Sequence, residues 1–330
     1  MEYTRLGRTG LKVSRLCLGT MTFGFQCDEE TSNAIMDRAF DGGVTFIDSA
    51  DVYPLGGGYE RTGRTEEIVG GWLQGRRDRV ILATKCFGRM GQAKWDGGAS
   101  RKHIMDAIDG SLRRLQTDYI DLYQLHQYDP ETPLDETLRA LEDVVRSGKV
   151  RYIGCSNWMA YQVARSLGRS EAMNIVRMDS VQPRYNLLFR QIERELLPLC
   201  LEEGVGVIPY NPIAGGMLTG KHKRDTGPTD GSRFTLGTAG SMYQERYWHD
   251  RQFDTVDQLL PIAAEAEMSL ATMATAWVMA NPAVTAPIIG ASRPEQLVDT
   301  LAAAEVTLSP DLKAKLDDLT VEYRWGDAAR

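Results

Sequence analysis

Short apolar stretches alternate with amphipathic stretches along most of the chain, and this alternation constrains the fold more than any other feature. The apolar, often β-branched stretches predict strands over residues 16–18, 44–47, 80–83, 120–125, 150–153, 180–182, 205–209 and 286–289. The amphipathic stretches predict helices over residues 29–40, 65–73, 101–115, 134–146, 159–167, 191–203, 257–280 (broken near 268–269) and 294–304. Strands that alternate with helices are typical of βαβ units and a parallel sheet.

The number of strands favours a closed barrel over an open sheet. Eight strands with helices between them match the (β/α)8, or TIM-barrel, pattern. A doubly wound dinucleotide domain would begin with a G-x-G-x-x-G turn after its first strand, and no such motif follows residues 16–18. We therefore predict an α/β protein, a (β/α)8 barrel in which residues 1–330 form a single domain.

Three additions to the barrel are also predicted. Residues 3–6 and 11–14, joined by "GRTG", indicate an N-terminal β-hairpin. Residues 309–323 indicate an extra C-terminal helix, with Ser309 as N-cap and Pro310 in its first turn. Residues 212–254 are rich in Gly, Thr and Arg, and a loop of that length in a compact fold is usually functional, such as a lid.

Composition excludes several classes of function. The net charge of -7 argues against sequence-independent nucleic-acid binding, which needs a basic surface. No apolar run approaches the roughly 20 residues needed to cross a bilayer, and the first residues lack a signal-peptide pattern. We expect no nucleic-acid or membrane partner.

The cysteines and histidines indicate neither disulfides nor a metal site. Five cysteines are scattered and include no C-x-x-C pair, so we expect reduced, buried thiols and a cytoplasmic protein. The four histidines lie far apart in the sequence, and we expect no metal. The oligomeric state stays open, a homo-oligomer included, because interfaces are a property of surfaces.

Polar residues follow successive predicted strands. Asp48 ends the second, Lys85 the third and His126 the fourth. The ends of the next strands carry "CSN", Gln182 and "YNP". Because chemistry in such barrels occurs at the carboxyl ends of the strands, these side chains are expected to share one rim, with Tyr53 in the adjoining loop.

This set of side chains has a specific chemical logic. A free tyrosine has a pKa of about 10 and is a poor acid near neutrality. A nearby lysine ammonium is expected to lower the pKa of Tyr53, and a carboxylate such as Asp48 can hold that lysine in place. A histidine can orient a carbonyl group while Tyr53 acts as general acid. Tyrosine supplies no electrons, so a redox cofactor is required.

The glycine cluster 56–58 follows Tyr53 but is not expected to bind phosphate. No Lys-Ser/Thr pair follows it, as a P-loop would require. We interpret these glycines as a turn between Tyr53 and the next helix, so the stretch "DSADVYPLGGGYERTGRTEE" is predicted to be the rim of a catalytic pocket.

The set Asp48, Tyr53, Lys85 and His126 resembles the catalytic tetrad of the aldo-keto reductase superfamily. Six further stretches are similar to family signatures in the same order and span essentially the whole chain. They are "LGTMTFG", "FIDSADVY", "ILATK", "DLYQLH", "RYIGCSN" and "PIIGAS". "GRTGLKVSRLCLGT" and "GKVRYIGCSN" resemble the bacterial branch related to potassium-channel β-subunits. The resemblance implies that Tyr53 donates a proton, Lys85 and Asp48 tune it, and His126 orients the carbonyl.

The resemblance also implies a set of positions for NADPH/NADP+. They are Gly19, Thr20, Met21 and Asp48 at the nicotinamide ribose; Ser156, Asn157 and Gln182 at the carboxamide; Tyr210 under the ring; Asn211, Pro212, Leu218, Gly220, Lys221 and Arg233 at the pyrophosphate; and Gly290, Ser292, Arg293, Gln296 and Asp299 at the adenosine. Ser292 and Arg293 suit a 2′-phosphate, which favours NADPH over NADH. Two positions depart from the family pattern: "YNPI" stands where "SPL" is common after the stacking residue, and Thr300 stands where asparagine is usual.

Aromatic side chains near the strand ends are candidates for the substrate pocket. Together with Tyr53 and His126 they are Phe23, Trp95, Tyr128 and Trp158. Each could equally pack beneath its own loop. Aromatic walls suit aldehydes, ketones and sugar-like rings alike.

Three functions are consistent with the sequence. The first is an NADPH-dependent carbonyl reductase acting on a small-molecule aldehyde or ketone. The second is a regulatory cofactor-binding protein similar to the channel β-subunits, with incidental turnover. The third is a barrel aldolase that uses Lys85 as a Schiff base, which would need a lysine of depressed pKa.

Overall fold

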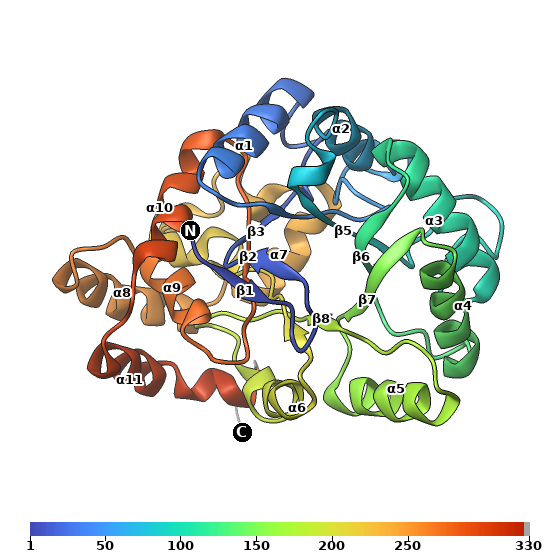
Figure 1. Ribbon diagram of the computed structural model, residues 1–330. Helices are drawn as coiled ribbons and strands as arrows, with labels where there is room; N and C mark the ends of the chain where they lie inside the picture. Colours follow the sequence, from blue (N-terminus) through green and yellow to red (C-terminus); the bar gives the residue numbers. More distant parts are fainter. Residues whose placement is uncertain (327–330) are drawn as a thin grey trace.

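Eight parallel strands form the centre of the protein in a computed structural model that describes residues 1–326 (Figure 1). In sheet order they are β10 (Ile288–Ile289), β3 (Cys17–Gly19), β4 (Phe46–Asp48), β5 (Ile81–Cys86), β6 (Ile120–Leu125), β7 (Val150–Ser156), β8 (Ser180–Gln182) and β9 (Gly206–Val207). Parallel bridges from Val207 to Val284 and from Tyr210 to Ile288 connect the two ends of this order. The predicted (β/α)8 barrel is therefore confirmed.

Helices surround the sheet (Figure 1). They are α1 (Glu29–Asp41), α2 (Arg64–Trp72), α3 (Arg101–Leu115), α4 (Leu134–Arg146), α5 (Ala160–Met173), α6 (Leu196–Glu203), α7 (Gly240–Tyr247), α8 (Asp250–Glu265), α9 (Leu270–Met279), α10 (Leu297–Ala302) and α11 (Pro310–Leu319). Helix α4 illustrates why these helices pack on the barrel: its apolar side chains Leu134, Leu138 and Leu141 recur at helical spacing and are buried along one face. No helix within the described residues is long and apolar enough to cross a membrane.

The predicted hairpin closes the amino-terminal end of the barrel. Strands β1 (Tyr3–Arg5) and β2 (Lys12–Ser14) pair antiparallel. Leu6, in the loop between these two strands, is fully buried and packs inside the barrel with Phe46, Leu122 and Ile208. Gly7 lies so close to α6's end that a Cβ there would be 2.4 Å from the Gly204 oxygen. Below the strand ends, the barrel is therefore a packed core.

Some helix boundaries differ from the predictions. The pattern over 257–280 is broken near residues 268–269 as predicted, because Ser269 starts α9 anew by accepting a hydrogen bond from the Thr272 amide. Helix α8, however, begins at Asp250 rather than at residue 257. The pattern over 191–203 begins with a separate 3-10 turn before α6. The C-terminal helix begins as predicted, with the Ser309 side chain accepting from the Leu312 amide, and α11 ends at Leu319.

The segment 212–254 is folded over the carboxyl ends of the strands. It contains α7, and an aromatic cluster of Phe234, Trp248 and Phe253 with ring centroids about 5 Å apart stabilises it. At Gly237 a Cβ would lie 2.4 Å from the Gly56 oxygen. The glycine cluster after Tyr53 thus provides a close backbone contact with this segment as well as a turn.

Candidate active site

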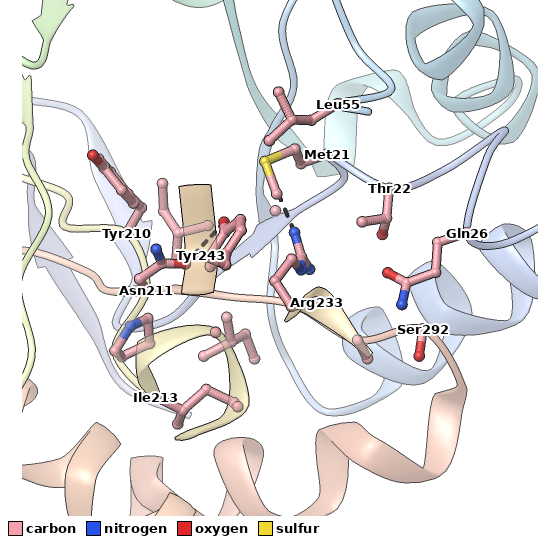
Figure 2. Close-up of a pocket in the computed structure, with 18 of the residues that line it drawn as sticks. Met21, Thr22, Gln26, Leu55, Tyr210, Asn211, Ile213, Arg233, Tyr243 and Ser292 are labelled. Atoms are coloured by element: carbon pink, nitrogen blue, oxygen red, sulfur yellow. Dashed lines mark hydrogen bonds between the residues drawn. The ribbon is translucent and has the colours of Figure 1, made fainter. Parts of the chain in front are cut away.

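A cavity of about 1420 Å³ opens at the carboxyl ends of the strands. Its walls come from the loops after β3 to β8, from the segment 212–254 and from the region around α10. Figure 2 shows part of this wall, with Arg233 of the long segment facing Met21 and Tyr243 facing Asn211. The volume exceeds the roughly 300–1,000 Å³ typical of drug-sized ligands, so the cavity can hold a large ligand.

A buried ion pair lies at the cavity floor, with Asp48 in the lining and Lys85 behind it. Lys85 Nζ, on β5, is 2.5 Å from Asp48 Oδ2 and donates to the Ser49 oxygen at 2.7 Å. The other Asp48 oxygen accepts hydrogen bonds from the Gln124 amide at 3.1 Å and the Gln182 amide at 2.9 Å. The carboxylate is thus bonded on both oxygens, which is what a buried charge requires.

The protonation state of Lys85 weighs against the aldolase hypothesis. Burial alone would lower its pKa, but the Asp48 carboxylate and then Tyr53 act in the opposite direction. The net result is a raised pKa, so Lys85 carries a charge at neutral pH. A Schiff-base lysine must instead present a neutral amine.

Tyr53 follows β4 and lies beside this ion pair. The Lys85 Nζ atom is 5.1 Å from the centre of the Tyr53 ring, and the His126 ring lies edge-on at 5.6 Å. Burial raises the pKa of Tyr53, and the charge of Lys85 offsets only part of that rise. The net direction is opposite to the expected lowering, because burial outweighs the lysine. The phenol is consequently protonated near neutrality, as a proton donor must be.

His126 directly follows β6 and lines the cavity next to Tyr53. Burial, followed by the positive charge of Lys85, lowers its pKa from 6.5 to about 3. The imidazole is therefore neutral at physiological pH. A neutral ring has one N–H to donate and one nitrogen to accept.

The depressed pKa of His126 predicts a distinctive pH dependence. Its ring should stay neutral from pH 8 down to pH 5, so its NMR signal, assigned with His126→Asn, should not shift over that range. The unfolded chain binds a proton near pH 6.5 and the folded chain near pH 3. Stability contributed by the neutral ring should therefore be lost as pH falls from about 6.5 toward about 3. A signal that titrates near pH 6.5 would contradict this assignment.

Most of the predicted cofactor residues line the cavity. They are Gly19, Met21, Asp48, Ser156, Asn157, Gln182, Tyr210, Asn211, Pro212, Lys221, Arg233, Gly290, Ser292, Arg293, Gln296 and Asp299. Thr20, Leu218 and Gly220 are not part of the lining. The Thr20 hydroxyl donates to the Asp48 backbone oxygen, Leu218 is buried in the core, and Gly220 forms a turn with a φ of +72°.

Four of the predicted substrate-pocket aromatics are not in the cavity wall. Phe23 is fully buried in the core beneath its own loop. Tyr128 and Trp158 pack edge-on against each other at 5.0 Å in a small separate recess, and Trp95 is exposed. Tyr53 and His126 do line the cavity, and the apolar surface near them comes from Met21, Val52, Leu55 and Phe87.

The sequence-based prediction missed Gln124, Tyr243 and Arg246. Gln124 lies two residues before His126 on β6, and side chains at that spacing point to the same face of a strand. That alternation could have identified it. Tyr243 and Arg246 lie on α7 inside the long segment, where no local pattern indicates contact with the cavity.

Several polar groups in the wall are poised for an anionic, hydrogen-bonding ligand. Asn211 Nδ2, Ser232 Oγ and Gln26 Oε1 are shielded from solvent and have no hydrogen-bond partner. Within residues 1–326, Lys221, Arg233 and Arg293 take part in no ion pair, although the three line the same cavity. Burial, and then the charge of Arg293, lowers the pKa of Lys221. Such groups fit a dinucleotide with its phosphates.

Fold and site together define a (β/α)8-barrel protein with its functional groups at the carboxyl ends of the strands, where barrel enzymes carry out their chemistry. The chain belongs to the aldo/keto reductase family, whose model matches residues 15–320. The resemblance noted in the sequence is thereby confirmed.

Relatives of the chain come from bacteria, plants and fungi. It is 42% identical to the uncharacterized oxidoreductase YrpG of Bacillus subtilis, covering 97% of this chain and 96% of that protein. It is 38% identical to a probable voltage-gated potassium channel subunit beta of Oryza sativa subsp. japonica, covering 96% of each. It is 33% identical to the versiconal hemiacetal acetate reductase of Aspergillus parasiticus, covering 94% of each.

Proposed function

We propose that this protein reduces an aldehyde or ketone, sugar-like carbonyl compounds included, to an alcohol with NADPH. The observation that carries the proposal is the group on the cavity floor: a protonated phenol beside a buried, charged lysine and a neutral imidazole. Oxidoreductases among the relatives support the same class of reaction.

Tyr53, Lys85 and His126 have different roles in this reaction. When bound, the reduced nicotinamide supplies a hydride to the carbonyl carbon. The Tyr53 hydroxyl donates its proton to the carbonyl oxygen, and the resulting phenolate is stabilised by the Lys85 charge. The neutral His126 ring donates a hydrogen bond that orients the carbonyl. Fixed charges act strongly here because Lys85 and Tyr53 are buried.

The cavity wall offers partners for each part of NADPH. The unpartnered Asn211 amide and the Lys221 and Arg233 cations suit its pyrophosphate. Ser292 and Arg293 suit the 2′-phosphate that distinguishes NADPH from NADH. The Ser292 amide and hydroxyl both donate to the Gln296 side chain, which holds Ser292 in the wall.

Removing the cation at Arg293 should weaken NADPH more than NADH. The Arg293→Ala change should raise the Kd for NADPH by roughly ten- to hundredfold, because a hydrogen bond to a charged group contributes about 1.5–3 kcal/mol. The Kd for NADH should change little, since NADH lacks the 2′-phosphate. Fluorescence titration of both nucleotides measures the difference. An equal loss for the two would place Arg293 elsewhere on the ligand.

The proposal as a whole is tested with purified protein, NADPH and a panel of aldehydes and ketones. We expect NADPH to bind with a fluorescence change and to be oxidised in the presence of at least one carbonyl compound. Absence of NADPH binding would overturn the cofactor assignment, and NADH would then be tested in its place.

A cofactor-binding regulatory protein is the second candidate. The similarity to a probable potassium channel subunit beta over nearly the whole chain favours it. The same assay separates the two functions. Tight NADPH binding with no turnover of any carbonyl compound supports the regulatory role, whereas substrate-dependent oxidation supports the reductase.

A further inference from the structure

One cation near the catalytic end of the cavity has no counter-charge. Arg246 lies on α7, is half-buried and lines the cavity. Its guanidinium is 6.0 Å from the centre of the Tyr243 ring. In the part of the chain that the structure describes, Arg246 takes part in no ion pair and donates no hydrogen bond. A half-buried guanidinium without an anion is an open position for one.

Arg246 belongs to the end of the cavity that holds His126. The Tyr243 ring is 6.0 Å from the Arg246 guanidinium, and its hydroxyl donates to Asn211, the residue after Tyr210, at 3.5 Å. In agreement with this placement, the charge of Arg246 opposes the rise in the pKa of Tyr210 that burial causes. The Tyr210 hydroxyl donates to Asn157 at 2.8 Å, and the Asn157 amide donates to the His126 backbone oxygen at 3.0 Å. Tyr243, beside Arg246, is in turn close enough to act on Tyr53.

Other charges near this end are already neutralised or held elsewhere. Asp48 is paired with Lys85. Arg184 also acts on Tyr210, but its guanidinium stacks on Phe189 at 3.5 Å and is not part of the cavity wall. The two further acids of the wall are Asp230, in the long segment, and Asp299 on α10.

The remaining wall near Tyr53 is apolar. It is formed by Met21, Val52, Leu55, Phe87 and Met242. A ligand complementary to this end therefore has a compact apolar body, a carbonyl directed at Tyr53 and His126, and one oxyanion within reach of α7. Arg233, which lies 5.5 Å from the centre of the same Tyr243 ring and contacts Met21, is assigned to the cofactor in the function proposed above.

Resting on the carbonyl reduction proposed above, we propose that the substrate carries an anionic group, a carboxylate or a phosphate, and that Arg246 binds it. Guanidinium groups form paired hydrogen bonds with both kinds of oxyanion. Arg246 is then the residue that selects charged aldehydes or ketones over neutral ones of the same shape.

Three aldehydes of similar shape test this specificity: 4-carboxybenzaldehyde, its neutral methyl ester, and 4-formylphenyl phosphate. They are assayed with NADPH on the wild type, Arg246→Gln, Arg246→Lys and the matched surface control Arg139→Gln. The wild type should prefer an anionic aldehyde to the ester in kcat/KM. Arg246→Gln should lower kcat/KM for that anion by roughly ten- to hundredfold and leave the ester within about twofold. Arg246→Lys should restore part of the loss.

Each outcome decides between explanations. The anionic aldehyde that loses more in Arg246→Gln identifies the group, carboxylate or phosphate. An equal loss for anion and ester, or no preference in the wild type, overturns the proposal. A raised Kd for NADPH in Arg246→Gln, with the anion preference intact, assigns Arg246 to the cofactor and overturns it as well.

Failure of the reductase function is distinguishable from failure of this inference. Binding of 4-carboxybenzaldehyde and its ester is measured by calorimetry, without NADPH. If no aldehyde is turned over but the anion binds more tightly in wild type than in Arg246→Gln, the inference stands while the reductase fails. If aldehydes are turned over without a preference for charge, the reductase stands and the inference fails.

Discussion

Replacing Tyr53 with phenylalanine should lower kcat for carbonyl reduction by about 10²- to 10⁴-fold, the contribution typical of a positioned general acid. The ring remains, so its edge-on contact with His126 and the cavity shape are preserved. The substitution removes the Tyr53 hydroxyl, which carries the proton to be donated. NADPH binding should stay within about twofold, because hydrogen bonds from the cavity wall to the cofactor do not depend on the phenolic hydroxyl.

Stopped-flow oxidation of NADPH under single-turnover conditions measures the effect without interference from product release. Tyr3→Phe is the matched control, since Tyr3 lies on β1 at the opposite end of the barrel. Its kcat should equal that of the wild type. Full activity in Tyr53→Phe would show that another group, or water, supplies the proton.

Replacing Asp48 with asparagine should lower the free energy of unfolding by about 3–5 kcal/mol, because it leaves the buried Lys85 ammonium without a counter-ion. Lys85 is 0% exposed and Asp48 3%, so water cannot compensate. The Gln124 and Gln182 amides, which now donate to a carboxylate, would face an amide instead. Catalysis should fall as well, since the Lys85 ammonium is no longer held by Asp48 in the position from which it stabilises the phenolate.

A double-mutant cycle separates stability from activity. Adding Lys85→Met to Asp48→Asn removes the unpaired cation, and the double variant should regain much of the lost stability in urea unfolding. It should not regain activity. Strictly additive losses would show that the two residues do not interact energetically, contrary to their 2.5 Å contact.

The fold and the central residues of the site were accessible from the sequence because both depend on local patterns. Apolar runs define parallel strands, and strand ends converge on one rim, so Asp48, Lys85 and His126 meet as predicted. Local sequence patterns do not show how deeply the residues of the site are buried. It is the three-dimensional packing around Tyr53 that raises its pKa instead of lowering it.

Features that depend on long-range packing were not predictable. Trp158 and Phe23 follow strands, as a pocket residue would, but Trp158 packs against Tyr128 from a neighbouring loop and Phe23 is buried in the core. Arg246 reaches the cavity only because an aromatic cluster and the Gly56–Gly237 contact fold the long segment over it. The family resemblance predicted cofactor positions that mostly line the cavity, whereas Gln124, Tyr243 and Arg246 were identified only from the structure.

The N-terminal hairpin closes one end of the barrel, so the cavity opens at the other end, where the strands have their carboxyl ends. Leu6 and its neighbours seal the base, so water approaches the Asp48–Lys85 pair only from above. A ligand that fills the mouth removes this last contact with bulk solvent. The occupant thereby lowers the local dielectric constant and strengthens the force that Lys85 exerts on Tyr53. The bound ligands therefore form the last part of the low-dielectric surroundings of Asp48, Lys85 and Tyr53.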